Sequence, residues 1–224
     1  MTEIEMKTDK TNKSDGDCYL CGVHLSKIAT KNHLLKNHDA EKGGQECCLL
    51  KIESCFDKNY WLYIDIPLEK TLSDIDRFLR KIWLECCGHL SEFYVNNHVP
   101  INKSLKLNRF TSGEKFFHMY DFGTTTETVI TVMGKTRRET QKSVVRLLAR
   151  NTPPVFKCAD CEKTADYICR ECAYQSDNPF YCDTCMKNHE CGEEMFVPVT
   201  NSPRMGECGY DGELDTFTFD PSVI

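Results

Sequence analysis

Alternating hydrophobic and polar positions in the middle of the chain predict a series of β-strands. The segments that we predict as strands are 60–66, 89–95, 116–122, 128–132 and 143–150. Pro67 ends the first of these runs. The last run, from Ser143 to Arg150, favours a strand but is short enough to form a helix instead.

One strong helical pattern follows the first of these strands. Thr71 and Asp74 have the spacing of a capping box, with Thr71 as the N-cap. Apolar residues then recur at helical spacing, and they are Ile75, Phe78, Leu79, Ile82 and Trp83. Gly88 is the predicted stop of this helix. A small sheet with one main helix predicts an α+β fold for the central domain, flanked by two small zinc modules.

Changes in composition divide the chain into five segments. We predict a disordered tail at 1–16, a zinc-finger-like module at 17–40, an α+β domain at 47–150, a two-zinc cysteine-rich module at 155–200 and an irregular tail at 201–224. The glycines after Lys42 and the prolines after Thr152 mark the two linkers between these parts.

The charge of the chain is unevenly distributed. The net charge of the 224 residues is −6. Residues 1–46 carry 7 basic against 8 acidic residues, residues 47–153 carry 16 against 12, and residues 154–224 carry 5 against 14. An acidic C-terminal part disfavours a protein that coats nucleic acid.

No apolar run approaches the roughly 18–20 residues of a membrane span. Met1 to Lys13 lack the apolar stretch of a signal peptide. We therefore expect a cytoplasmic protein without membrane partners.

Cysteine spacing carries the strongest chemical signal. The chain has 15 cysteines. Four C-x2-C pairs occur, at Cys18/Cys21, Cys158/Cys161, Cys169/Cys172 and Cys182/Cys185. Without a secretory signal these pairs indicate zinc rather than disulfides, and four pairs exceed the single pair of a redox dithiol.

The first module has the ligand order of a two-Cys-two-His finger. Its candidate zinc ligands are Cys18, Cys21, His33 and His38. The four-residue gap between His33 and His38 places both imidazoles near one face of a helix. We expect the small core to contain Leu25, Ile28, Leu34 and Leu35.

The second module supplies eight ligands, enough for two tetrahedral sites. Its order resembles B-box-like modules, in which alternate pairs share a metal. That resemblance implies one site at Cys158, Cys161, Cys182 and Cys185, and another at Cys169, Cys172, His189 and Cys191. Cys208 is an alternative to Cys191 as the eighth ligand. With the finger, the chain is expected to bind three Zn²⁺ ions, all structural because protein ligands fill every position.

Three motifs in the central domain resemble those of a known family. They are TLSDI at 71–75, HLSEF at 89–93 and KFFHMYDFG at 115–123. With their order and spacing, the stretch from about Cys48 to Val132 resembles the plasmid pRiA-four-b ORF-three-like domain family. Residues 201–210 resemble the tail of members that carry a zinc-ribbon extension.

The resemblance implies an α+β fold but no established activity. Some members of the family carry a resolvase-type label from their mobile-element neighbourhood, and the chain shows no serine-recombinase constellation. Residues 124–128 also depart from the D-x-W-x-H sequence that many members have after the corner. The resemblance therefore points to no active site there.

We interpret the chain as a non-enzymatic interaction or regulatory protein that binds a protein partner. The first alternative is a nucleic-acid-binding protein linked to mobile elements, using the finger and the basic surface from Lys135 to Lys142. The second is a hydrolase-like enzyme near His118 and Asp121, with His89 and His98 as further candidates. The cysteines outside ligand spacing are read as buried thiols, and they are Cys47, Cys48, Cys55, Cys86 and Cys87.

Overall fold

A nine-stranded antiparallel sheet forms the centre of the molecule in the computed structural model, which describes residues 14–38, 44–139 and 144–212. Its strands, in the order in which they lie side by side, are β2 (His24–Ser26), β1 (Asp15–Cys18), β9 (Arg146–Asn151), β4 (Trp61–Pro67), β3 (Gln45–Ser54), β8 (Thr126–Arg138), β7 (Lys115–Tyr120), β5 (Ser91–Val95) and β6 (Val99–Ile101). The predicted α+β class is confirmed, and the last predicted strand forms as β9. The sheet is wider than expected because β1 and β2 of the first zinc module extend it, and because β3 and β6 were not predicted.

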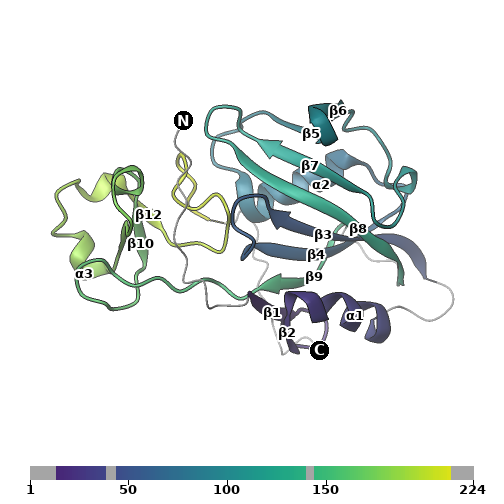
Figure 1. The fold of residues 1–224 in the computed structure, drawn as a ribbon, viewed down its shortest axis with the longest axis horizontal. Helices are drawn as coiled ribbons and strands as arrows, with labels where there is room; N and C mark the ends of the chain where they lie inside the picture. The colour runs from purple at the N-terminus through teal and green to yellow at the C-terminus, as the bar shows by residue number, and fades with distance from the viewer. Residues whose placement is uncertain (1–13, 39–43, 140–143, 213–224) are drawn as a thin grey trace.

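A second, three-stranded sheet lies to one side of the large one (Figure 1). Its strands are β11 (Phe180–Tyr181), β10 (Tyr167–Cys169) and β12 (Phe196–Pro198). The helices are α1 (Lys27–Asn37), α2 (Leu72–Leu79) and α3 (Asp183–Met186), with a π-helical turn at Arg80–Leu84 and short 3-10 turns at Asn96–His98, Leu107–Arg109, Cys172–Tyr174 and Glu193–Met195. No helix among the described residues is long and apolar enough to cross a membrane.

The central strand β4 is buried along its whole length. Leu62, Ile64 and Ile66 point into the main core beneath α2, whereas Trp61 and Tyr63 point into a second core on the opposite face. Because successive side chains of a strand alternate between faces, both faces of the sheet must be covered at this point. The alternation that the sequence shows is therefore between two apolar cores rather than between core and solvent.

Helix α2 covers the first face of the sheet (Figure 1). The backbone N–H of Thr71 donates to Asp74 Oδ2 (2.9 Å), so the predicted capping box begins the helix. All five predicted apolar positions of this helix are buried. The helix does not reach Gly88 as predicted, because a π-helical turn, closed by the N–H of Glu85 on Arg80 O (2.9 Å), ends it at Leu84.

Helix α1 of the finger covers the second face. Leu34 is fully buried there against Trp61 and Tyr63. Ile28, expected in the finger's core, is instead 85% exposed, because the core of this module is the sheet itself. Thr30 fills a position where an apolar residue is usual, and its hydroxyl donates to Ser26 O (3.0 Å).

The N-terminal strand β1 pairs with β9, with Gly16 opposite Asn151. A Cβ atom at Gly16 would lie 2.1 Å from Arg150 O, so this close pairing requires glycine. Asp15 and Gly16 thus belong to a strand although the tail 1–16 was expected to be disordered. The rest of that tail, residues 1–13, lies outside the described residues, as do residues 213–224.

The segment 201–212 contains turns rather than regular elements, and it packs between the small module and the large sheet (yellow in Figure 1). Ser202 Oγ donates to Trp83 O (2.6 Å), and Trp83 Nε1 donates to Asn201 O (3.1 Å). Tyr210 is buried, with its hydroxyl 3.4 Å from Ile82 O. The segment is irregular in backbone, as predicted, but it is a packed part of the structure.

Helix α1 packs on the sheet through one face only, so shortening side chains on its two faces should change the free energy of unfolding by different amounts. We expect Leu34→Ala to lower the free energy of unfolding by about 3 kcal/mol, because it opens a cavity beneath the helix. Ile28→Ala, on the exposed face of the same helix, should change it by less than about 0.5 kcal/mol. Urea denaturation of both variants measures the difference, and equal effects would contradict the docked arrangement.

Candidate metal centres

The first predicted ligand set is assembled at the junction of β1, β2 and α1. Cys18 Sγ lies 3.5 Å from His38 Nε2, and Cys21 Sγ lies 3.3 Å from His33 Nε2. The two Nε2 atoms are 3.1 Å apart. The turn that holds the cysteines is closed by the N–H of Gly22 on Cys18 O (2.8 Å).

These separations match a tetrahedral zinc site. Zn–S bonds of about 2.3 Å and Zn–N bonds of about 2.0–2.1 Å place two sulfur atoms about 3.8 Å apart, sulfur and nitrogen about 3.6 Å apart, and two nitrogen atoms about 3.4 Å apart. The four ligand atoms of the finger lie within 4.8 Å of one another. The chemistry of the donors, two thiolates and two imidazoles, also suits zinc.

The second module brings together the two interleaved sets that the sequence predicts. One set is Cys158, Cys161, Cys182 and Cys185, and the other is Cys169, Cys172, His189 and Cys191. In the second set, Cys172 Sγ lies 3.1 Å from His189 Nε2 and 3.8 Å from Cys191 Sγ. Cys191 lies in this group, whereas Cys208 lies in another.

The structure also assembles a fourth group, which the sequence analysis missed. It consists of Cys86, Cys87, His89 and Cys208. The interpretation of Cys86 and Cys87 as buried thiols is wrong, because Cys86 is only half-buried and Cys87 is exposed. Cys208 lies 121 residues from Cys87, so no local spacing connects them. The sequence offered one signal for this group, which is the compact stretch Cys86-Cys87-Gly88-His89 together with Cys208, a cysteine outside every C-x2-C pair.

Two thiols in these groups have a lowered pKa, which favours the thiolate, the form that binds metal. A hydrogen bond with His89 lowers the pKa of the Cys208 thiol to about 7. Burial opposes ionisation of Cys158, but hydrogen bonds from the backbone of Cys182 and Asp160 outweigh it and lower the pKa to about 6. Burial raises the pKa of other candidate ligands, Cys18 to about 11 and Cys172 to about 12, just as it raises that of Cys55, which belongs to no group, to about 12.

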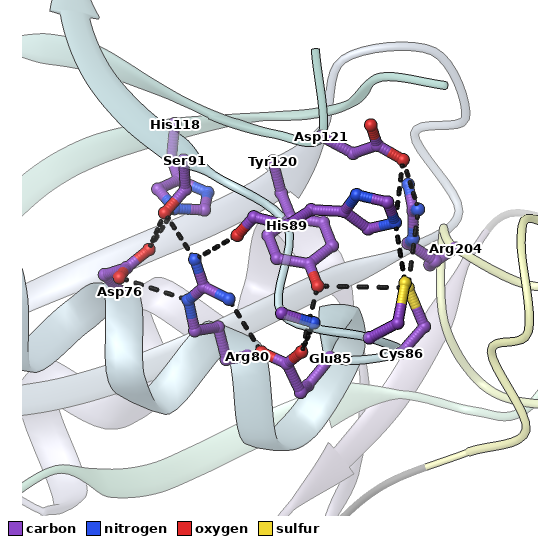
Figure 2. A network of polar contacts seen from close by, with 12 residues as sticks. Asp76, Arg80, Glu85, Cys86, His89, Ser91, His118, Tyr120, Asp121 and Arg204 are labelled. Atoms are coloured by element: carbon purple, nitrogen blue, oxygen red, sulfur yellow. Dashed lines mark hydrogen bonds and ion pairs between the residues drawn. The ribbon is translucent and has the colours of Figure 1, made fainter. Parts of the chain in front are cut away.

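A polar network runs from α2 to the fourth group (Figure 2). Asp76 accepts hydrogen bonds from Ser91 (2.7 Å) and Lys103 (3.2 Å), and Arg80 donates to it at 3.3 Å. Burial would raise the pKa of Asp76, but hydrogen bonds from His118 and Ser91 dominate and hold it well below its usual range. Asp76 is therefore the charged centre of this network.

The residues of the enzyme hypothesis do not form the expected set. His118 is fully buried, and its Nε2 lies 2.8 Å from Asp76 Oδ1. Burial lowers the pKa of His118, so the neutral ring donates its Nε2–H to this carboxylate. His89, rather than His118, lies near Asp121, with Nε2 and Oδ2 3.4 Å apart. His98 stacks on the ring of Tyr94.

The basic stretch of the nucleic-acid hypothesis is divided between surface and core. Arg138 is buried and donates to Asp65 Oδ1 (2.8 Å). Arg137 is exposed and pairs with Glu46 at 2.9 Å. Lys142 lies outside the described residues. On the finger helix, Lys27 pairs with Glu53 (3.1 Å).

Comparisons with known proteins give little information about function. No family model matches the chain, and none of the curated proteins matches it. One solved structure with a partly similar fold is described as a protein of unknown function, MM3350 from Methanosarcina mazei Go1. It is 15% identical, with a TM-score of 0.42 over 48% of this chain and 70% of that chain.

The assembled sets predict a defined loss of metal. We expect Cys18→Ser and Cys158→Ser each to remove about one zinc equivalent per chain, since a missing thiolate opens a tetrahedral site. Cys55→Ser, a cysteine outside every group, should leave the zinc content unchanged. Elemental analysis of protein purified without added metal measures this, and equal zinc in Cys158→Ser and wild type would contradict the assignment.

Removing the negative charge of Asp76 should lower the stability of the fold strongly. Asp76→Asn should lower the free energy of unfolding by about 3–5 kcal/mol, because Arg80 and Lys103 lose the carboxylate that they share. Asp183→Asn, which breaks the exposed pair with Lys187, should change it by less than about 1 kcal/mol. Thermal and urea unfolding compare the two variants, and a small loss in Asp76→Asn would show that the network contributes little.

Proposed function

We propose that this chain is a zinc-organised interaction protein, in which the metal ions hold modules in shape and a protein partner binds to their surface. The observation that carries the proposal is the composition of the finger and of the two interleaved groups. Each supplies four protein donors, with a histidine nitrogen or a cysteine sulfur at every position. A tetrahedral zinc so bound has no position left for a catalytic water.

The small size of the C-terminal cores supports a structural role for zinc. One core of the C-terminal module contains Ala165, Ile168, Phe180, Val197 and Met205, and the other contains Cys169, Tyr181 and Met186 with three further candidate ligands packed against it. Cores of this size do not stabilise a fold of about 50 residues alone. Metal binding therefore supplies much of the folding free energy of this module.

Three exposed apolar side chains supply a docking surface: Tyr174 lines a cleft, and Leu90 and Phe122 directly follow two of its lining residues, His89 and Asp121. Leu90, Phe122 and Tyr174 are 72%, 53% and 63% exposed. The carbonyl of Leu90 accepts from the N–H of Asp121, the residue before Phe122, and Tyr174 lines the cleft with Asp121. The cleft has a volume of about 420 Å³. Apolar side chains gathered in this way mark interaction surfaces.

The charge of the C-terminal module indicates the chemistry of the partner. Residues 154–224 carry 5 basic against 14 acidic residues. A zinc ion bound by four thiolates adds a formal charge of −2, and one bound by three thiolates and an imidazole adds −1. We therefore propose a partner protein that presents basic and apolar side chains. Reduced thiols for zinc agree with a cytoplasmic location.

The experiment compares quantitative binding by the wild type and by a double variant, Phe122→Asp/Tyr174→Asp. A partner identified by cross-linking should bind the double variant at least about tenfold more weakly, because charge replaces the apolar rim. Ile28→Asp, an exposed apolar site on α1, is the matched control and should bind normally. Zinc content and unfolding curves of all three proteins must agree.

Two results would contradict this function. A partner that binds the double variant as tightly as the wild type would remove the cleft from the interface. Binding to DNA or RNA that weakens steeply with salt would favour the nucleic-acid hypothesis instead.

A further inference from the structure

The group of Cys86, Cys87, His89 and Cys208 differs from the other three in the way it is built. Each of the others draws its ligands from one short module, whereas this one joins the end of the α2 region to the C-terminal segment. We propose that it binds a Zn²⁺ ion, and that this ion clasps residues 201–210 to the central domain. The inference goes beyond the proposed function, because it does not depend on the other three sites.

The distances within the group fit zinc. Cys86 Sγ and Cys87 Sγ are 3.8 Å apart, and Cys87 Sγ and Cys208 Sγ are 3.6 Å apart. His89 Nε2 lies 3.0 Å from Cys87 Sγ and 3.6 Å from Cys208 Sγ. A tetrahedron of Zn–S and Zn–N bonds requires about 3.8 Å and about 3.6 Å for these two kinds of separation.

A buried cation contacts one of the candidate ligand sulfurs. Zinc with three thiolates and a neutral imidazole has a net charge of −1. Arg204 is fully buried beside it, with Nη2 3.6 Å from Cys86 Sγ and 2.7 Å from Asp121 Oδ2. The Arg204 guanidinium, shared between the Asp121 carboxylate and a ligand sulfur, offsets part of this negative charge and orients the ligand.

The backbone is bent at both halves of the group. Gly88 has φ 82°, which turns the chain between Cys87 and His89. Cys208 has φ 52°, in the left-handed region that disfavours residues other than glycine, asparagine and aspartate. Strained backbone of this kind is retained where a neighbouring interaction fixes it, and ligation of Cys208 is such an interaction.

The proposed ion is reachable from solvent. Cys87 is exposed, and His89 and Cys208 line the cleft of about 420 Å³. A chelator can approach this site from the cleft, so we expect it to remove the zinc of the clasp. Undocking of the C-terminal segment would then follow loss of the metal.

The first experiment maps thiol alkylation in the wild-type chain. Protein purified under reducing conditions is treated with iodoacetamide, with and without a chelator, and labelled cysteines are located by peptide mass spectrometry. Cys87 should be protected at least about tenfold until the chelator is added, although its side chain is exposed. Cys55, outside every group, should label at the same rate in both conditions.

The second experiment measures zinc and docking in Cys208→Ser. Zinc should fall from four to three equivalents per chain, and amide exchange at Met205 and Glu207 should accelerate at least about tenfold. Cys55→Ser is the matched control and should keep four equivalents. Cys21 and Cys161 should stay protected in Cys208→Ser, which separates loss of the clasp from failure of the zinc sites behind the proposed function.

Two results would overturn the clasp. One is wild-type protein with three zinc equivalents in which Cys87 labels as fast as in the denatured chain. The other is a disulfide between Cys87 and either Cys86 or Cys208 in protein purified without reductant, which would make the group a redox pair. If Cys208→Ser does not fold, the labelling of the wild type decides the question.

Discussion

The burial of both faces of β4 is the constraint on which the rest of the structure depends. Helix α2 covers one face, but the local sequence offers nothing to cover Trp61 and Tyr63 on the other. That cover comes from α1, with Leu34 inserted over the aromatic side chains. The finger is therefore part of the main fold rather than an appendage, because its helix closes one face of the sheet.

A second set of contacts ties the C-terminal segment to the opposite part of the domain. The ring of Tyr120 lies between two guanidinium groups, with Arg80 4.8 Å and Arg204 5.0 Å from its centre. Arg80 belongs to the network around Asp76, and Arg204 comes from the segment after the small module. Cation–π contacts of this kind are strongest when they are shielded from water. Tyr120 thus joins two parts of the chain that are far apart in sequence.

Much of the fold could be predicted from the sequence because the signals were local. The capping box at Thr71, the apolar face of α2 and three of the ligand groups all arise from residues close together in the chain. The partner of His118 could not be predicted, because alternation in β7 gives the face of the sheet but not the helix residue above it, which is Asp76.

The fourth ligand group depends on a contact between residues 121 positions apart, and sequence spacing says nothing about such contacts. Arg138 is a further example of the same limit. We expected Arg138 at the surface because it is charged, whereas it lies in the core, where it pairs with the buried carboxylate of Asp65. In both cases a long-range partner decided the role of the side chain.

The pairing of β1 with β9 has a consequence for the order in which the chain assembles. Gly16 lies opposite Asn151, so β1 cannot pair with β9 until more than a hundred further residues have left the ribosome. Strand β9 also pairs with β4, which is likewise synthesised long before it. The nascent chain therefore passes through a stage in which one edge of β4 and one edge of β1 lack their partner, and insertion of β9 between them ends that stage.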